Sequence, residues 1–270
     1  MLPKGAIELL RILMVGDVVG RPGREAVTQL LPDLLDELEV DFTVVNGENA
    51  AQGAGITRPM ATELFEAGAD CVTLGNHTWA RREIGKFLDL EPRLIRPANY
   101  PPGAPGVGLF RGQARGGRPV AVLNLMGRVY MPNFLDCPFR VGDEILQGLP
   151  AGTTVLVDFH AEATSEKIAY GRYVDGRVSA VLGTHTHVPT ADECLLPGGT
   201  AYQTDVGMTG PLDSVIGMNA DIALKRFLTG MPHKAEVAGG DAALMATLVE
   251  VGPKGRAHSI QRLVRRLGRG

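Results

Sequence analysis

Cysteine is scarce in this sequence. The 270 residues contain three cysteines, far apart at Cys71, Cys137 and Cys194. An odd number of distant cysteines argues against a disulfide framework and against a zinc site built from thiolates. We therefore expect a reducing compartment and a cytoplasmic protein.

Long hydrophobic runs are also missing. No uncharged apolar stretch approaches the roughly 20 residues that a membrane-spanning helix needs. The most apolar early segment, residues 7–19, is interrupted by Glu8, Arg11 and Asp17, and no small-residue cleavage site follows it. We expect neither a signal peptide nor a membrane partner.

Positive charge is not in excess, because the formal net charge is -3. Proteins that bind long nucleic acids by bulk electrostatics carry a strongly basic face, so no stable nucleic-acid complex is expected. The carboxyl end is an exception. Two explanations stay open, a solvated edge strand protected by its charges, which we favour, or a patch that steers phosphates. The basic residues concerned are Lys254, Arg256, Arg262, Arg265, Arg266 and Arg269.

The first hundred residues alternate strand and helix patterns, which is typical of βαβ units and predicts an α/β fold. Pro22 suits the first turn of a helix, and Ala26, Leu30, Leu34 and Leu38 follow at helical spacing. We expect strands over residues 11–15, 41–45, 70–74 and 94–98, and a helix over residues 59–67.

The second half has more glycine and proline turns, which favour antiparallel hairpins over residues 107–110 with 119–125 and over 243–251 with 259–264. We expect further strands over 153–157, 178–182 and 201–204 and helices over 165–173 and 220–228. Residues 126–133 and 208–211, rich in glycine, proline and methionine, are expected to be loops. The absence of repeats and linkers predicts one domain over residues 1–270.

Polar clusters follow several of the expected strands. In an open α/β sheet the carboxyl ends of the strands are where ligands bind, so these clusters predict one site. The clusters carry Asp17, Glu48 with Asn49, Asn76 with His77, His160, and His185 with His187.

Each cluster has an ordinary structural explanation when it is taken alone. Asp17 could cap the helix near Pro22, Asn76 could bond its own turn, and Glu48 could simply begin a loop. His160 could be a satisfied buried histidine, or Asp158 and Glu162 could fix its tautomer as they would for a metal ligand. The coincidence of all these clusters at strand ends favours a metal centre.

Nitrogen and oxygen ligands without sulfur favour manganese, iron or zinc. We expect iron or manganese first, with zinc as the alternative. Two divalent ions held about 4 Å apart need a shared carboxylate, for which Glu48 is the best candidate. His185 and His187 would face the same side of an extended strand, and a loop could still aim both at adjacent ions.

This set of residues resembles the calcineurin-like metallophosphoesterase superfamily, and more closely its YmdB-like family. The resemblance extends from about Arg11 to Pro211. The motifs that carry it are, in order, Gly-Asp-Val-Val-Gly, Asn-Gly-Glu-Asn-Ala, Gly-Asn-His-Thr-Trp, Asp-Phe-His-Ala-Glu-Ala-Thr-Ser-Glu-Lys, Gly-Thr-His-Thr-His-Val-Pro-Thr-Ala-Asp and Thr-Asp-Val-Gly-Met-Thr-Gly-Pro.

The resemblance implies a four-layer α/β/β/α sandwich and a centre of two metal ions. It implies that Asp17 and His187 bind one ion, that Asn76, His160 and His185 bind the other, and that Glu48 bridges them. Most relatives in the superfamily have Asp-x-His where this chain has Asp17-Val18-Val19, and the resemblance implies that Asn49 replaces the missing imidazole. The bridging residue is also a glutamate instead of the usual aspartate.

The resemblance further implies a phosphodiesterase that hydrolyses small phosphodiesters, with 2′,3′-cyclic nucleotides preferred, by in-line attack of a metal-bound hydroxide. His77 is then placed to act as the general acid. With such a substrate, the loops at residues 126–133 and 208–211 could wall a nucleotide pocket, where Arg128 and Tyr130 could contact a phosphate or a base. Two other functions stay open. One is a phosphomonoesterase or protein phosphatase that uses the same centre, and the other is a regulatory protein that binds a nucleotide or RNA with incidental hydrolysis. The oligomeric state is open too, a homo-oligomer included.

Overall fold

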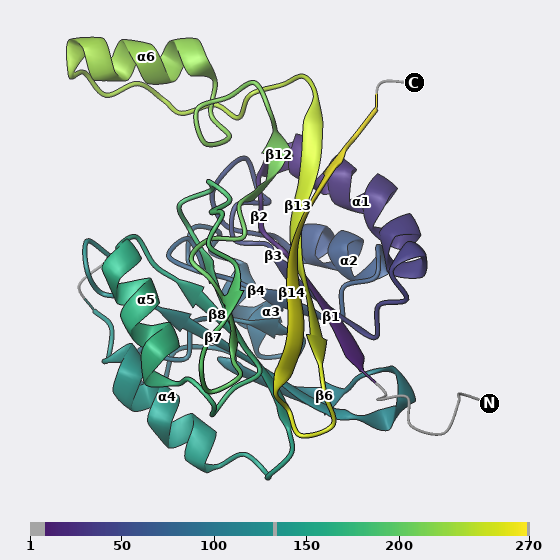
Figure 1. Cartoon of the computed structure of the whole chain (residues 1–270). Helices are drawn as coiled ribbons and strands as arrows, with labels where there is room; N and C mark the ends of the chain where they lie inside the picture. Colours follow the sequence, from purple (N-terminus) through teal and green to yellow (C-terminus); the bar gives the residue numbers. More distant parts are fainter. Residues whose placement is uncertain (1–8, 132–133, 269–270) are drawn as a thin grey trace.

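The computed structural model of the chain (Figure 1) describes residues 9–131 and 134–268 and contains two β-sheets with helices around them. The helices are α1 (Gly20–Glu37), α2 (Arg58–Glu66), α3 (Ile84–Leu88), α4 (Pro138–Gln147), α5 (Thr164–Tyr173) and α6 (Ala220–Thr229), with a 3-10 turn at Arg115–Gly117. The predicted α/β class is confirmed.

The first sheet has eight strands in the order β2-β12-β13-β1-β3-β4-β5, with β14 paired to β13. Its parallel part, β1 with β3, β4 and β5, is the βαβ series that the sequence predicts. The strands are β1 (Leu10–Val15), β2 (Asp17–Val18), β3 (Phe42–Asn46), β4 (Cys71–Thr73), β5 (Leu94–Ile95), β12 (Met208–Pro211), β13 (Ala242–Val251) and β14 (Ala257–Arg266).

The second sheet has six strands in the order β10-β11-β9-β8-β7-β6. The predicted hairpin of β6 with β7 is antiparallel, while β7, β8, β9 and β11 run parallel. The strands are β6 (Leu109–Gln113), β7 (Pro119–Met126), β8 (Thr154–His160), β9 (Ala180–Thr184), β10 (Cys194–Leu195) and β11 (Ala201–Gln203).

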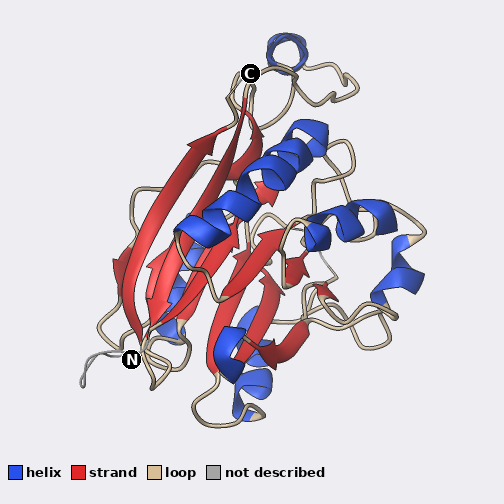
Figure 2. Cartoon of the chain, turned by 90° about the vertical axis from the view of Figure 1, so that its right-hand side faces the viewer, coloured by secondary structure: helices blue, strands red, loops and turns tan. Residues whose placement is uncertain are grey.

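Apolar side chains alternate between the two faces of each central strand, so each sheet has two packed faces. In β1, Ile12 and Met14 pack with Val122 and Leu156 of the second sheet, whereas Leu13 and Val15 belong to the cluster that includes residues of α1, α2 and α3. The other face of the second sheet packs against α4 and α5, whose Tyr170 stacks on Phe159. Figure 2 shows helices along the outer faces of the sheets.

The expected loop at residues 208–211 is wrong, because Met208–Pro211 forms the buried strand β12. Met208 and Thr209 pair in parallel with Asp17 and Val18, so backbone pairing with a distant segment overrides the glycine and proline content. Residues 132–133 of the other expected loop lie outside the described residues.

Helix α4 was not predicted from the sequence. Gly142 interrupts its apolar pattern, but this glycine faces α5, where a Cβ atom would lie 2.5 Å from the hydroxyl oxygen of Tyr170. The glycine therefore allows close packing of two helices and does not end the helix.

The basic residues Arg262, Arg265 and Arg266 lie on the edge strand β14. This strand pairs antiparallel with β13, which confirms the predicted closing hairpin. Arg262 bonds Glu193 at 2.7 Å and Arg265 bonds Glu37 at 2.8 Å, which supports the charged edge strand over a free phosphate patch. Arg269 lies outside the described residues. Among the residues described here, none of the helices is long and apolar enough to cross a membrane.

Substitution of Leu156 by alanine should lower the free energy of unfolding by about 2–5 kcal/mol, because it opens a cavity between the two sheets. Leu156 is fully buried, whereas Leu90 is 75% exposed and serves as the control. Urea denaturation should show less than about 0.5 kcal/mol of change for Leu90→Ala. Equal losses for the two variants would contradict this assignment of the core.

Candidate metal centre

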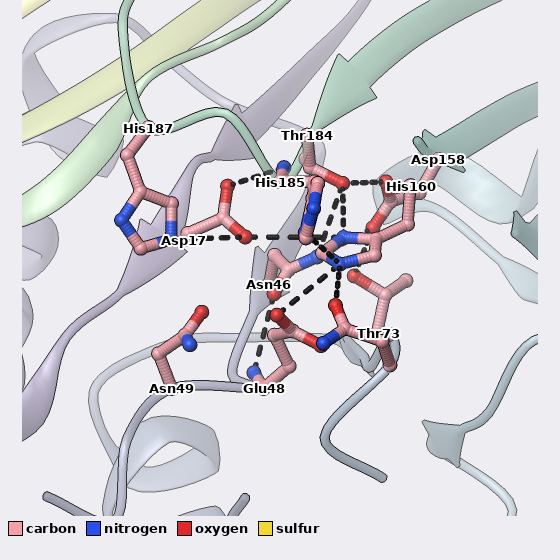
Figure 3. A network of polar contacts seen from close by, with 12 residues as sticks. Asp17, Asn46, Glu48, Asn49, Thr73, Asp158, His160, Thr184, His185 and His187 are labelled. Carbon is pink, nitrogen blue, oxygen red and sulfur yellow. Dashed lines mark hydrogen bonds and ion pairs between the residues drawn. The ribbon is translucent and has the colours of Figure 1, made fainter. Parts of the chain in front are cut away.

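The predicted ligand residues meet at one edge of the two sheets (Figure 3). Those from the first sheet follow or lie on β2, β3 and β4, and those from the second sheet lie at or just beyond the carboxyl ends of β8 and β9. Asp17 is in β2, Glu48 and Asn49 follow β3, Asn76 follows β4, His160 ends β8, and His185 and His187 follow β9.

The Nε2 atom of His160 is the point where these groups come closest. It lies 2.9 Å from Oδ1 of Asn76, 3.1 Å from Oε1 of Glu48 and 3.1 Å from Nδ1 of His185. Ligand atoms of Glu48, His160 and His185 all lie within 4.8 Å of one another. A single proton on Nε2 can satisfy only one of these neighbours well, whereas a cation among them would attract them all.

The other nitrogen of His160 bonds a neighbouring hydroxyl group. Its Nδ1 atom lies 2.8 Å from Oγ1 of Thr184, which donates a 2.7 Å hydrogen bond to Asp158. The prediction that Asp158 fixes the tautomer of His160 therefore holds only through the bridging hydroxyl of Thr184. The same prediction for Glu162 is wrong. Glu162 lies 3.1 Å from Nε2 of His185 instead, because it follows β8 on a turn that faces the β9 loop.

Two buried oxygen atoms at this edge have no hydrogen-bond partner among the described residues, Oδ1 of Asp17 and Oδ1 of Asn49. The Nδ2 atom of Asn49 donates to Gly53 at 2.9 Å, which distinguishes the amide nitrogen from the free oxygen. Asp17 does not cap α1, whose N-cap residue Val19 makes no side-chain bond. Buried acceptors without donors are rare and costly, so these oxygens fit a bound cation.

One ring nitrogen of His187 bonds the backbone and the other faces Asp17. Its Nδ1 atom bonds the carbonyl oxygen of Ile216 at 2.9 Å, and because a carbonyl only accepts, this nitrogen carries the proton. In the neutral imidazole the Nε2 atom then carries a lone pair, and it lies 3.9 Å from Oδ1 of Asp17. The loop version of the His-x-His pair is therefore the one observed, since both residues lie beyond β9.

Burial and charge act in opposite directions on the two acids. Burial raises the pKa of Asp17 to about 6, although His187 and His160 act against it. Burial also acts to raise the pKa of Glu48, but His160 and the backbone N–H of His77 outweigh it and lower the value to about 2. Glu48 therefore stays ionised although its side chain is only 1% exposed.

The pKa values of the imidazoles of His160 and His185 are shifted in opposite directions. Glu48 and Asp17 overcome the burial of His160 and raise its pKa to about 9, while burial and the charge of His160 lower the pKa of His185 to about 3. A cation that displaces the proton of His160 would keep the acids neutralised.

His77 lies beside these groups. Its backbone N–H donates to Oε2 of Glu48 at 3.1 Å, and its side chain is half-buried. At the opposite side, Gly127 donates to the carbonyl oxygen of His160 at 3.0 Å, and Glu166 accepts from the backbone N–H groups of Arg128 and Val129. The side chains of Arg128 and Tyr130 are exposed, and their contact with substrate stays a prediction.

Comparison with known proteins identifies the family of this chain. The model of the YmdB-like protein family matches residues 13–263. The chain belongs to the YmdB-like family. It is 49% identical over 243 residues to the 2′,3′-cyclic-nucleotide 2′-phosphodiesterase of Bacillus subtilis (strain 168), a match that covers 90% of this chain and 91% of the relative.

Solved structures of similar chains agree with this membership of the YmdB-like family. A hypothetical protein from Thermus thermophilus is 48% identical, with a TM-score of 0.90 over 95% of this chain and 99% of that one. A novel phosphatase from Mycoplasma pneumoniae is 32% identical, with a TM-score of 0.91 over 97% of this chain and 95% of that one.

Sequence reasoning named Asp158 but missed its partners Asn46 and Thr184 beneath the site of this YmdB-like chain. Asp158 accepts from Asn46 at 3.0 Å and from Thr184 at 2.7 Å, and all three residues are buried. The available signal was a threonine and an asparagine within otherwise apolar strands. Gly75 is a further omission, because a Cβ atom there would lie 2.3 Å from Oε2 of Glu48 and 2.4 Å from Nε2 of His160.

Substitution of Thr184 by valine should lower the free energy of unfolding by about 1–3 kcal/mol, because it leaves a buried carboxylate oxygen and an imidazole nitrogen without their common partner. The matched control is Thr154→Val in the same strand pair. Thr154 is fully buried, and its hydroxyl has no partner among the described residues. Urea unfolding that shows Thr154→Val to be as damaging as Thr184→Val would refute the bridging role.

Proposed function

We propose that this protein is a phosphodiesterase that uses two metal ions to hydrolyse small phosphodiesters, with 2′,3′-cyclic nucleotides preferred. The observation that carries the proposal is the convergence of Glu48, His160 and His185, whose ligand atoms lie within 4.8 Å of one another. The buried free oxygens of Asp17 and Asn49 support it. The substrate class follows from the 49% identity to the B. subtilis cyclic-nucleotide phosphodiesterase.

The residues present suit two ions. We assign Asn76, His160 and His185 to one ion, and Asp17, Asn49 and His187 to the other. The unpartnered oxygens of Asp17 and Asn49 and the Nε2 atom of His187 support this second group. Glu48 is the proposed bridge, and its low pKa of about 2 supplies the charge that this position requires. Nitrogen and oxygen donors suit manganese, iron and zinc. Of these we propose iron or manganese, with zinc as the alternative.

When bound, the ions would make a coordinated water more acidic and would offset the charge that builds on the phosphoryl oxygens. The protein supplies the rest of the chemistry. His77 is half-buried at the rim, and its backbone N–H already bonds Glu48 at 3.1 Å. We assign its imidazole the role of protonating the leaving oxygen, which a general acid in hydrogen-bond reach can do.

The fold fits this proposal at a finer level. The three apolar clusters, one between the sheets and one outside each sheet, support a four-layer α/β/β/α sandwich of the metallophosphoesterase type. Residues of both sheets build the proposed centre, which supports a single domain.

Metal removal should abolish hydrolysis of 2′,3′-cyclic nucleotides, and manganese, iron or zinc should restore it. A panel of a 2′,3′-cyclic nucleotide, a bis-aryl phosphodiester and an aryl monophosphate should rank the cyclic nucleotide first by kcat/KM. Glu48→Gln should bind less metal and should not recover, because it lacks the bridging charge. Full activity without metal would disprove the centre, and faster turnover of the monoester would favour a phosphomonoesterase.

Substitution of His77 by alanine should lower kcat by about 10²–10⁴-fold, the usual contribution of a general acid. The metal content should stay at the wild-type level, because alanine keeps the backbone N–H that bonds Glu48. His258→Ala is the control, since His258 is exposed on β14. If His77→Ala instead loses metal and regains wild-type turnover when metal is resupplied, the proton-donor role is wrong.

A further inference from the structure

A buried ion pair lies behind the proposed centre. Nζ of Lys167 in α5 bonds Oδ2 of Asp205 at 2.8 Å, and the two side chains are 1% and 0% exposed. Removing two charges from water costs free energy, and their mutual attraction does not always offset this cost. Further hydrogen bonds to the two groups are then needed to stabilise the buried pair. No role was assigned to either residue from the sequence.

Asp205 makes those further bonds to Thr186, the residue between the two proposed histidine ligands. The same Oδ2 atom accepts from the backbone N–H of Thr186 at 3.0 Å and from its hydroxyl at 2.6 Å. The other oxygen, Oδ1, accepts from Gly207 at 2.8 Å, and the carbonyl oxygen of Gly207 accepts from the backbone N–H of Asp17 at 3.1 Å. One carboxylate thus connects to segments that carry His185, His187 and Asp17.

The backbone around Thr186 is strained. His185 and His187 have φ angles of 96° and 66°, in the region that residues with a side chain seldom occupy. Strain of this kind persists only where the surroundings determine the conformation, and it occurs often at functional sites. Here the two strained residues flank the one whose N–H and hydroxyl both bond Asp205. The left-handed turns direct one imidazole toward His160 and the other toward Asp17.

We propose that Asp205 is a positioning residue that holds the His185–Thr186–His187 segment in its strained form, with Lys167 balancing its charge, so that both imidazoles face the metal ions. The inference rests on the proposed function, because it assumes that the histidines bind metal. It adds a cause for their orientation. Without the bonds to Asp205 the segment would relax, and the binding-competent form would be only partly populated, which lowers apparent affinity in proportion.

The hydroxyl of Thr186 allows the sharpest test. Thr186→Val keeps the shape and the backbone N–H but removes the 2.6 Å bond, whereas Thr186→Ser keeps a hydroxyl. Calorimetric titration of the metal-free full-length protein with Mn²⁺ should show an affinity about tenfold or more weaker for Thr186→Val, since a hydrogen bond to a charged group is lost. Thr186→Ser should restore most of that affinity, which a role in filling space would not predict.

Controls separate this inference from the proposed function. Thr154→Val makes the same chemical change at a buried site at the far end of β8 and should bind Mn²⁺ as the wild type does. If the wild type itself binds no metal, both the proposed function and this inference fail. If the wild type binds metal and Thr186→Val or Asp205→Asn binds it equally well, only the positioning role fails.

Global unfolding is excluded by circular dichroism of each variant. Should Thr186→Val not fold, Thr186→Ala removes the same hydroxyl with less bulk. Hydrogen exchange gives a readout independent of metal. The amides of His185 and Thr186, which bond Asp17 and Asp205, should exchange faster in the metal-free variant than in the metal-free wild type. Unchanged exchange at both amides would also overturn the inference.

Discussion

Buried carboxylates at the meeting edge of two sheets are the constraint on which the rest of this structure depends. Asp17, Glu48, Asp158 and Asp205 are all fully or almost fully inaccessible to solvent. Negative charge in such a place must be matched by donors or by cations. Asp158 and Asp205 are matched by hydroxyl, amide and ammonium groups of the chain, whereas Asp17 keeps an oxygen without a partner among the described residues. The hydrogen-bond donors therefore distinguish acids that stabilise the surrounding structure, such as Asp158 and Asp205, from Asp17, which keeps an oxygen available to a cation.

The two sheets contribute different things to this edge. Among the proposed ligands, the first sheet supplies the carboxylates and amides, and the second supplies the imidazoles, with Thr184 beneath them. Contacts between Asn46 and Asp158 and between Asp17 and the backbone of His185 cross from one sheet to the other. A change in the packing between the sheets would therefore alter distances among the proposed ligands. The geometry of the proposed centre thus depends on the apolar cluster between the sheets.

Much of this arrangement could be predicted from the sequence because parallel strands end at a common edge. That rule was enough to bring Asp17, Glu48, Asn76 and the histidines together. It could not decide that Glu162 faces His185, since a partner beyond a strand depends on how the following turn bends. It also missed β12, whose pairing with β2 is a tertiary interaction, and the bond between Lys167 and Asp205, which no local pattern connects. Helix α4 was missed because Gly142 serves packing, a role that composition alone does not reveal.

The pairing of the first strands with the last ones sets the order of events during synthesis. Leu10 of β1 pairs with Val251 of β13, and Asp17 pairs with Met208. On a ribosome the amino-terminal carboxylates thus emerge long before their partners, and contacts so distant in the chain form late. Because β1 pairs with β13, the first sheet is complete only after residue 251 has been made, so any ion that the proposed centre takes up would meet its finished framework late in synthesis.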